Sequence, residues 1–88
     1  MSNRFEGKVA IVTGASRGIG EAIARMYAAN GAKVVCASRK LEGVTAVAES
    51  IGPAAIAVAA HTGREDDCVA LVQTAVEKLG KVDILVNN

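Results

Sequence analysis

The stretch that decides the fold is TGASRGIG, at residues 13–20. It overlaps the end of an apolar, β-branched run at residues 8–13 (KVAIVT), which predicts a buried strand that breaks into a turn. From Ile19 onward the apolar residues recur at helical spacing. Asn30 and Gly31 predict the C-terminal end of this helix, because both residue types tolerate the left-handed backbone conformation found there. The sequence therefore predicts a strand, a glycine-rich turn and a helix in direct succession.

Strand and helix continue to alternate along the rest of the chain. Buried strands are predicted at residues 33–37, 54–60 and 82–86, and helices at residues 41–51 and 64–79. The strands are continuously apolar rather than alternating, which is typical of a parallel sheet with helices on both faces. No linker, repeat or change of composition divides the chain, so we expect a single domain.

Right-handed crossovers determine the order of the strands. If the second and third strands step outward on one side of the first, and the fourth returns to its other side, the order is 3-2-1-4. The fold class expected is α/β, a Rossmann-type doubly wound parallel sheet. Its ligands bind beyond the carboxyl ends of the strands, at the switch point between the first and fourth strands.

Each helix should bury an apolar stripe against this sheet. The residues expected to face inward are Ile19, Ala22, Ile23 and Met26 in the first helix, Leu41, Val44, Ala48 and Ile51 in the second, and Cys68, Val72, Ala75, Val76 and Leu79 in the third.

Composition argues against nucleic acid as a partner. The 88 residues carry a formal net charge of +1, and the basic residues are scattered. Phe5 and Tyr27 are the only aromatic residues, so the chain offers no platform for stacking bases. We therefore expect neither DNA nor RNA as a partner.

Cysteine usage and hydropathy predict a cytoplasmic setting. Cys36 and Cys68 lie far apart and form no metal-ligand cluster with the single histidine, His61. No apolar run reaches the roughly eighteen residues that a membrane span needs, and residues 1–8 lack the apolar core of a signal peptide. We expect no metal site, no disulfide and no association with a membrane.

Three glycines in the decisive stretch have physical uses at a phosphate-binding turn. Gly14, Gly18 and Gly20 allow positive φ, close approach of a backbone to a pyrophosphate, and tight packing of the helix on its strand. Amide groups at the start of the helix then face the phosphates. A glycine-rich turn without a ligand is the plain alternative, which the flanking strand and helix disfavour. A P-loop is excluded because no Gly-Lys-Ser/Thr follows. The candidate binding residues here are Gly14, Ser16, Arg17, Gly18, Ile19 and Gly20.

Together with DILVNN at residues 83–88, TGASRGIG resembles the cofactor-binding half of a short-chain dehydrogenase/reductase. The resemblance runs from residue 5 to the first half of the family's Asn-Asn-Ala-Gly motif, and is closest in character to NADP-dependent carbonyl reductases and 3-oxoacyl-carrier-protein reductases. It implies hydride transfer between a nicotinamide cofactor and a carbonyl or alcohol substrate, in an intact protein that is a homo-oligomer.

The end of the second strand indicates which dinucleotide is preferred. An acidic residue there would favour NAD, whereas a neutral residue with a nearby arginine favours a 2′-phosphate. This chain has Ser38 and Arg39, with Arg17 of the glycine loop as a second cation. Since a guanidinium can bind phosphate through two parallel hydrogen bonds, we expect NADP (NADPH) rather than NAD. The alternative is that Arg39 and Lys40 are merely solvated residues ahead of a helix.

Three further cofactor contacts are implied by the resemblance. Asn88 would line the cofactor ribose, while Asn87 ties the sheet together. His61 follows the third strand, where the family usually places Asp or Asn against the adenine. His61 and Thr62 would then touch adenine, and a simple surface histidine is the alternative.

The family's catalytic serine, tyrosine and lysine have no counterparts in this sequence. The single tyrosine, Tyr27, has Gly31 four residues later where a lysine is required, so no catalytic residue is assigned. Doubly wound domains commonly run to about 200–250 residues. We therefore expect residues 1–88 to be the N-terminal part of a single dinucleotide-binding domain, an incomplete sheet whose catalytic and substrate-binding residues lie beyond Asn88.

Two other interpretations remain open at this point. A non-catalytic dinucleotide-binding or regulatory module would carry the same motifs without hydride transfer. An isolated piece with no stable fold of its own is the other alternative, because the fourth strand would be a bare apolar edge.

Overall fold

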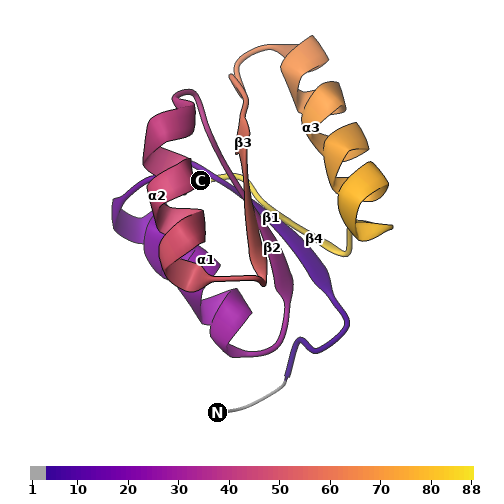
Figure 1. The fold of residues 1–88 in the computed structure, drawn as a ribbon. Helices are drawn as coiled ribbons and strands as arrows, with labels where there is room; N and C mark the ends of the chain where they lie inside the picture. The colour runs from indigo at the N-terminus through magenta and orange to yellow at the C-terminus, as the bar shows by residue number, and fades with distance from the viewer. Residues whose placement is uncertain (1–3) are drawn as a thin grey trace.

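A computed structural model describes residues 4–88. Residues 1–3, which begin the stretch expected to lack a signal-peptide core, lie outside the described residues. The elements follow the predicted alternation: β1 (Val9–Thr13), α1 (Gly18–Ala29), β2 (Lys33–Ser38), α2 (Leu41–Ile51), β3 (Ala55–Ala59), α3 (Glu65–Leu79) and β4 (Ile84–Val86). The strands form one parallel sheet in the order β3-β2-β1-β4, which confirms the predicted order (Figure 1).

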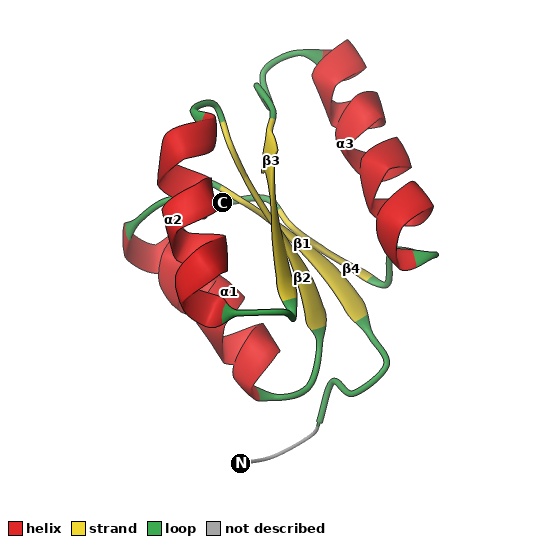
Figure 2. Cartoon of the chain, in the orientation of Figure 1, coloured by secondary structure: helices red, strands yellow, loops and turns green. Residues whose placement is uncertain are grey.

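The sheet is covered by α1 and α2 on one face and by α3 on the other (Figure 2). Successive side chains of β1 and β2 point to opposite faces, and both strands are buried almost throughout, which explains their unbroken apolar sequences. The core beneath α1 and α2 contains Val12, Val34, Cys36, Ala24, Val44 and Val47, and the core beneath α3 contains Ile11, Val35, Ala37, Leu71 and Ala75.

The predicted inward face of α1 is largely wrong. The helix approaches the sheet with Gly20 and Ala24, which are buried. Ile19 is 73% exposed, and Met26 and Ala22 are exposed as well. Small residues let the helix backbone come close to the strands, so the larger apolar side chains of this helix are displaced to its flanks. Of the predicted stripe, only Ile23 packs against the core.

Similar corrections apply to α2 and α3. Leu41 is exposed, whereas Val44, Ala48 and Ile51 contribute to the packing as predicted. On α3 Ala75 is buried as predicted and Leu71, which was not predicted, is buried beside the sheet as well, while Val72 is 40% and Val76 is 45% exposed. Consecutive helical residues are about 100° apart around the helix axis. Val72 and Val76 each lie one residue beyond a buried position, so their side chains turn away from the sheet. Cys68 and Leu79 are partly buried.

The amino end of the sheet is held by Asp83, a residue just before β4. Its carboxylate Oδ2 accepts the backbone N–H of Val9 at 2.9 Å and lies 3.0 Å from the Lys81 ammonium. The Asp83 N–H in turn donates to the Val9 carbonyl at 2.9 Å. The Val9 hydrogen bond, followed by the one from Lys81, holds the pKa of Asp83 below its usual value.

This lowered pKa predicts a pH-dependent contribution to stability. A carboxyl group with a depressed pKa in the folded state stabilises the fold above its unfolded pKa, near 4, and loses that contribution as pH falls through the folded value. Asp83→Asn should therefore lower the thermal midpoint of the whole protein at pH 7, and the gap from the wild type should close toward pH 3. Glu6→Gln, which removes an exposed acid in the segment before β1, is the control. A gap for Asp83→Asn that is constant across this range would contradict the assignment.

Candidate functional site

The carboxyl ends of the four parallel strands meet at one edge of the sheet (Figure 1). The segments at this edge are the glycine loop after β1, the last residue of β2 (Ser38) with residues 39–40 after it, residues 60–64 after β3, and residues 87–88 after β4. Every residue that the sequence analysis proposed for cofactor binding lies in one of these segments or in the first turn of α1. The fold thus gathers residues from four separate parts of the chain.

Close contacts within the glycine loop require the absence of side chains. A Cβ built on Gly20 would lie 2.0 Å from the carbonyl oxygen of Gly14 and 2.8 Å from Asn88 Nδ2. Gly14 itself has φ +62° and would place a Cβ 2.9 Å from Asn88 Nδ2. The loop therefore passes directly between the start of α1 and the end of β4.

The first turn of α1 presents free amides to this edge. Arg17 is the N-terminal cap residue, with extended backbone (φ −166°), and no side chain bonds to the turn. The first amides of any α-helix lack partners within the helix, and the helix dipole adds positive potential there. Gly18, Ile19 and Gly20 thus offer backbone donors to an anion, in the arrangement that phosphate groups occupy in other proteins.

Thr13, which the sequence analysis did not assign to the site, joins the ends of β1 and β4. The residue is 3% exposed, and its hydroxyl accepts the N–H of Asn88 at 2.9 Å. The same hydroxyl lies 3.3 Å from both the Val86 carbonyl and Asn87 Oδ1, either of which accepts its hydrogen. Asn88 also donates from Nδ2 to the Gly14 carbonyl, at 3.5 Å. The sequence alone carries no signal of this role, because it depends on the contact with Asn88.

The turn after β2 carries the second arginine. Ser38 Oγ donates to the Lys40 carbonyl at 2.9 Å, which shapes the turn, and the Arg39 side chain is exposed. The glycine loop is tied to the same strand end by the N–H of Ala15, which donates to the Ala37 carbonyl at 3.1 Å. Arg17 and Arg39 therefore extend from neighbouring loops, and neither forms an ion pair among residues 4–88.

His61 shapes the turn after β3. Its N–H donates to the Asp67 carboxylate at 2.9 Å, and its Nδ1 accepts the N–H of Gly63 at 3.0 Å. The ring is thus fixed through Nδ1, which leaves Nε2 available to a ligand. Thr62 is exposed, and its carbonyl accepts the thiol of Cys68 at 3.4 Å.

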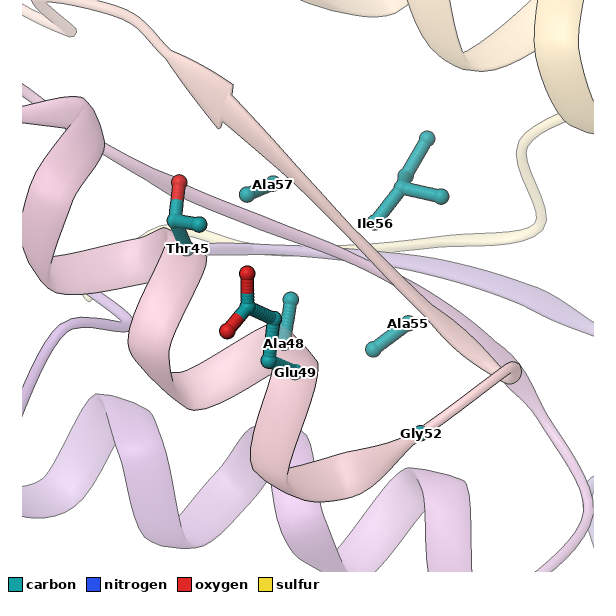
Figure 3. A pocket seen from close by; sticks show the side chains of 7 residues that line it. All are labelled: Thr45, Ala48, Glu49, Gly52, Ala55, Ile56 and Ala57. Atoms are coloured by element: carbon teal, nitrogen blue, oxygen red, sulfur yellow. The ribbon is translucent and has the colours of Figure 1, made fainter.

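Of two hollows among residues 4–88, one lies at this edge. A groove of about 420 Å³ lies away from it, between α2 and β3, and is lined mainly by small side chains, with Glu49 as its one charged residue (Figure 3). A smaller cavity of about 100 Å³ lies at the edge and is lined by Thr13, Thr62 and Asn87 among others. We place the candidate site at the carboxyl edge, because the free amides and the two arginines lie there and not in the groove.

In the part of the chain that the structure describes, neither the buried cysteine nor the metal-binding residue types form a second site. Cys36 is buried, and burial raises the pKa of its thiol to about 11 despite the opposing influence of Arg25. Such a thiol is a core residue and not a nucleophile. Among residues 4–88, no three metal-binding side chains gather at one place, and none of the helices has the length and apolar character to cross a membrane.

This arrangement is that of a dinucleotide-binding α/β protein, and comparison with known families specifies which one. Residues 8–88 match the family model described as short chain dehydrogenase. The chain belongs to the short-chain dehydrogenase family, as the two sequence motifs predicted.

Individual relatives are similar over nearly the whole chain. It is 44% identical to tropinone reductase-like 1 from Erythroxylum coca over 97% of the chain and 31% of that protein. The crystal structure of 3-ketoacyl-(acyl-carrier-protein) reductase from Brucella melitensis complexed with NADH matches with a TM-score of 0.89 and 52% identity, over 92% of this chain and 33% of that one. A hydroxysteroid dehydrogenase structure from Escherichia coli matches with a TM-score of 0.94 and 43% identity, over 98% and 37%. The chain thus spans about a third of the length of these relatives.

Proposed function

We propose that the carboxyl edge of this sheet binds NADP(H), and that the chain is the dinucleotide-binding part of an oxidoreductase that acts on a small carbonyl or alcohol compound. The observation that carries the proposal is the open first turn of α1 beside two exposed arginines, with Gly20 and Gly14 in backbone contact. When bound, the nicotinamide supplies or accepts the hydride.

The residues at the edge fit such a cofactor. The amides of Gly18, Ile19 and Gly20 would hold the pyrophosphate, for which the bare Gly14 and Gly20 leave room. Asn88, oriented through its N–H by Thr13, would line a ribose. His61 and Thr62 would contact the adenine from the end of β3. No residue of this chain is assigned a catalytic role.

The preference for NADP(H) over NAD(H) rests on charge at the end of β2. Ser38 stands where an acid would repel a 2′-phosphate, and Arg39 and Arg17 can bind that phosphate from two loops. The Brucella melitensis reductase was solved with NADH, so the family fold by itself does not decide between the two cofactors.

The substrate class and the setting are parts of the same proposal. The names of the similar proteins include a tropinone reductase-like protein, a ketoacyl reductase and a hydroxysteroid dehydrogenase, all of which denote carbonyl or alcohol chemistry. We propose such a compound as the substrate. Residues 1–88 would form the N-terminal part of one dinucleotide-binding domain, in a homo-oligomeric cytoplasmic protein.

Arg39→Ala tests the cofactor preference. Charge-assisted hydrogen bonds contribute about 1.5–3 kcal/mol, so the affinity of the whole protein for NADPH should fall ~10-fold to ~100-fold. NADH affinity should stay within about twofold, because NADH lacks the 2′-phosphate. Calorimetric titration measures both. Arg4→Ala, an exposed arginine that lies before β1 and away from the carboxyl edge, is the matched control. An unchanged NADPH preference in Arg39→Ala would refute the role of Arg39, and tight NADPH binding without hydride transfer would favour a regulatory module.

A further inference from the structure

The glycine loop and α2 approach each other unusually closely at Ser16 and Gly43. A Cβ built on Gly43, the third residue of α2, would lie 2.9 Å from Ser16 Cβ and 3.7 Å from Ser16 Oγ. Separations below 3.0 Å are essentially never adopted by real Cβ atoms. Any other residue at position 43 would therefore force α2 and the loop apart, since Ser16 Cβ is fixed to the loop backbone.

Conformation does not explain this glycine. Gly43 lies within the helix, and it is not among the glycines with positive φ. Glycine in a helix interior is about 0.8–1 kcal/mol less favourable than alanine. Position 43 therefore requires glycine for a steric reason, because the Ser16 side chain occupies the volume that a Cβ at position 43 would need.

The two segments that meet here carry Arg17 and Arg39, the arginines proposed to bind the 2′-phosphate. Ser16 immediately precedes Arg17, and Gly43 follows the turn that presents Arg39. The base of the loop is fixed to β2 by the hydrogen bond from Ala15 to Ala37, and the Ser38 hydroxyl fixes the turn at Lys40. With both anchors on β2, the contact between Ser16 and Gly43 sets the remaining distance between the loop and the start of α2.

We propose that Gly43 is a specificity-determining positioning residue, which lets α2 approach the glycine loop closely enough for Arg17 and Arg39 to share one 2′-phosphate. This inference rests on the proposed NADP(H) function. Gly43 touches no cofactor atom in this account, because it acts through the spacing of the two arginines.

The test compares two nucleotides that differ only in the 2′-phosphate, adenosine 2′,5′-bisphosphate and 5′-AMP. In calorimetric titrations of the whole protein, Gly43→Ala should weaken bisphosphate binding ~10-fold, the equivalent of one charge-assisted hydrogen bond, and leave 5′-AMP within about twofold. Thr45→Ala is the control, because Thr45 lies on the same helix but lines the groove beside β3. Thermal unfolding checks that each variant is folded.

A second pair of variants tests the contact itself. Ser16→Gly removes the Cβ that a residue at position 43 would strike, so adding Gly43→Ala to Ser16→Gly should not change the ratio of the two affinities further. If the wild type prefers the bisphosphate and Gly43→Ala has the same ratio of bisphosphate to 5′-AMP affinity, the role of Gly43 is overturned. The proposed cofactor would stand in that case. Equal affinities in the wild type would overturn both.

Discussion

Gly20→Ala is expected to abolish dinucleotide binding. Its new Cβ would lie 2.0 Å from the carbonyl oxygen and 2.7 Å from the carbonyl carbon of Gly14. Both are backbone atoms, so relief requires α1 to move away from the loop, and the amides of its first turn move with it. Overpacking of this kind typically costs about 1–3 kcal/mol of stability. NADPH affinity should fall ~100-fold or more, since several phosphate hydrogen bonds are lost together. Calorimetric titration measures the affinity, and denaturant unfolding measures the stability.

Gly7→Ala separates this steric effect from the general strain of replacing a glycine. Gly7 has φ +82° and no atom within 4 Å of a built Cβ, and it lies before β1, away from the carboxyl edge. The variant should lose some stability, because left-handed backbone costs about 1–2 kcal/mol for other residues, but should bind NADPH as the wild type does. Wild-type affinity in Gly20→Ala would show that the loop can yield, and the account of the site would be wrong.

Thr13→Val is expected to have the second large effect, on the junction between β1 and β4. The substitution conserves shape but removes the hydroxyl that accepts from Asn88 and donates to Val86 or Asn87. Asn87 and Asn88 are exposed and Val86 is only partly buried, so the loss is that of a net hydrogen bond, and the free energy of unfolding should fall by about 0.5–1.5 kcal/mol. Denaturant titration of the whole protein provides the measurement.

NADPH affinity should fall as well in Thr13→Val, because Asn88 loses the acceptor that holds its backbone beside Gly14. Thr13→Ser retains the hydroxyl and is the conservative control, expected to stay close to the wild type in binding. If Thr13→Val matched the wild type in both stability and binding, the hydroxyl would have no part in the site.

The architecture could be predicted because it depends on local patterns. Continuous apolar strands interrupted by helical stretches specify a parallel sheet, and right-handed crossovers leave few strand orders. The faces of the helices that contact the sheet were harder to predict from the sequence. Ile19 and Val72 have the apolar character of core residues, but Gly20, Ala24 and Leu71 make the contacts. Which line of a helix touches the sheet depends on how closely the backbones approach, and that is a tertiary property.

The candidate site likewise contains residues that local sequence patterns reveal and residues that only tertiary contacts reveal. The glycine loop, Arg17 and Arg39 are recognisable because the residues that define them are adjacent in sequence. Thr13 and Gly43 are not, because their roles arise from contacts with Asn88 and Ser16, which are distant in the chain. Threonine at a strand end and glycine in a helix are each unremarkable until the partner is known.

We propose that the carboxyl edge of this sheet binds a dinucleotide with a 2′-phosphate. The decisive measurement is calorimetric titration of the whole protein with NADPH and with NADH. We predict one cofactor per chain, with NADPH bound at least ~10-fold more tightly, the difference that one charge-assisted contact to the 2′-phosphate supplies. Binding of neither cofactor would show that this edge is not a dinucleotide site, and a preference for NADH would show that it does not bind a 2′-phosphate.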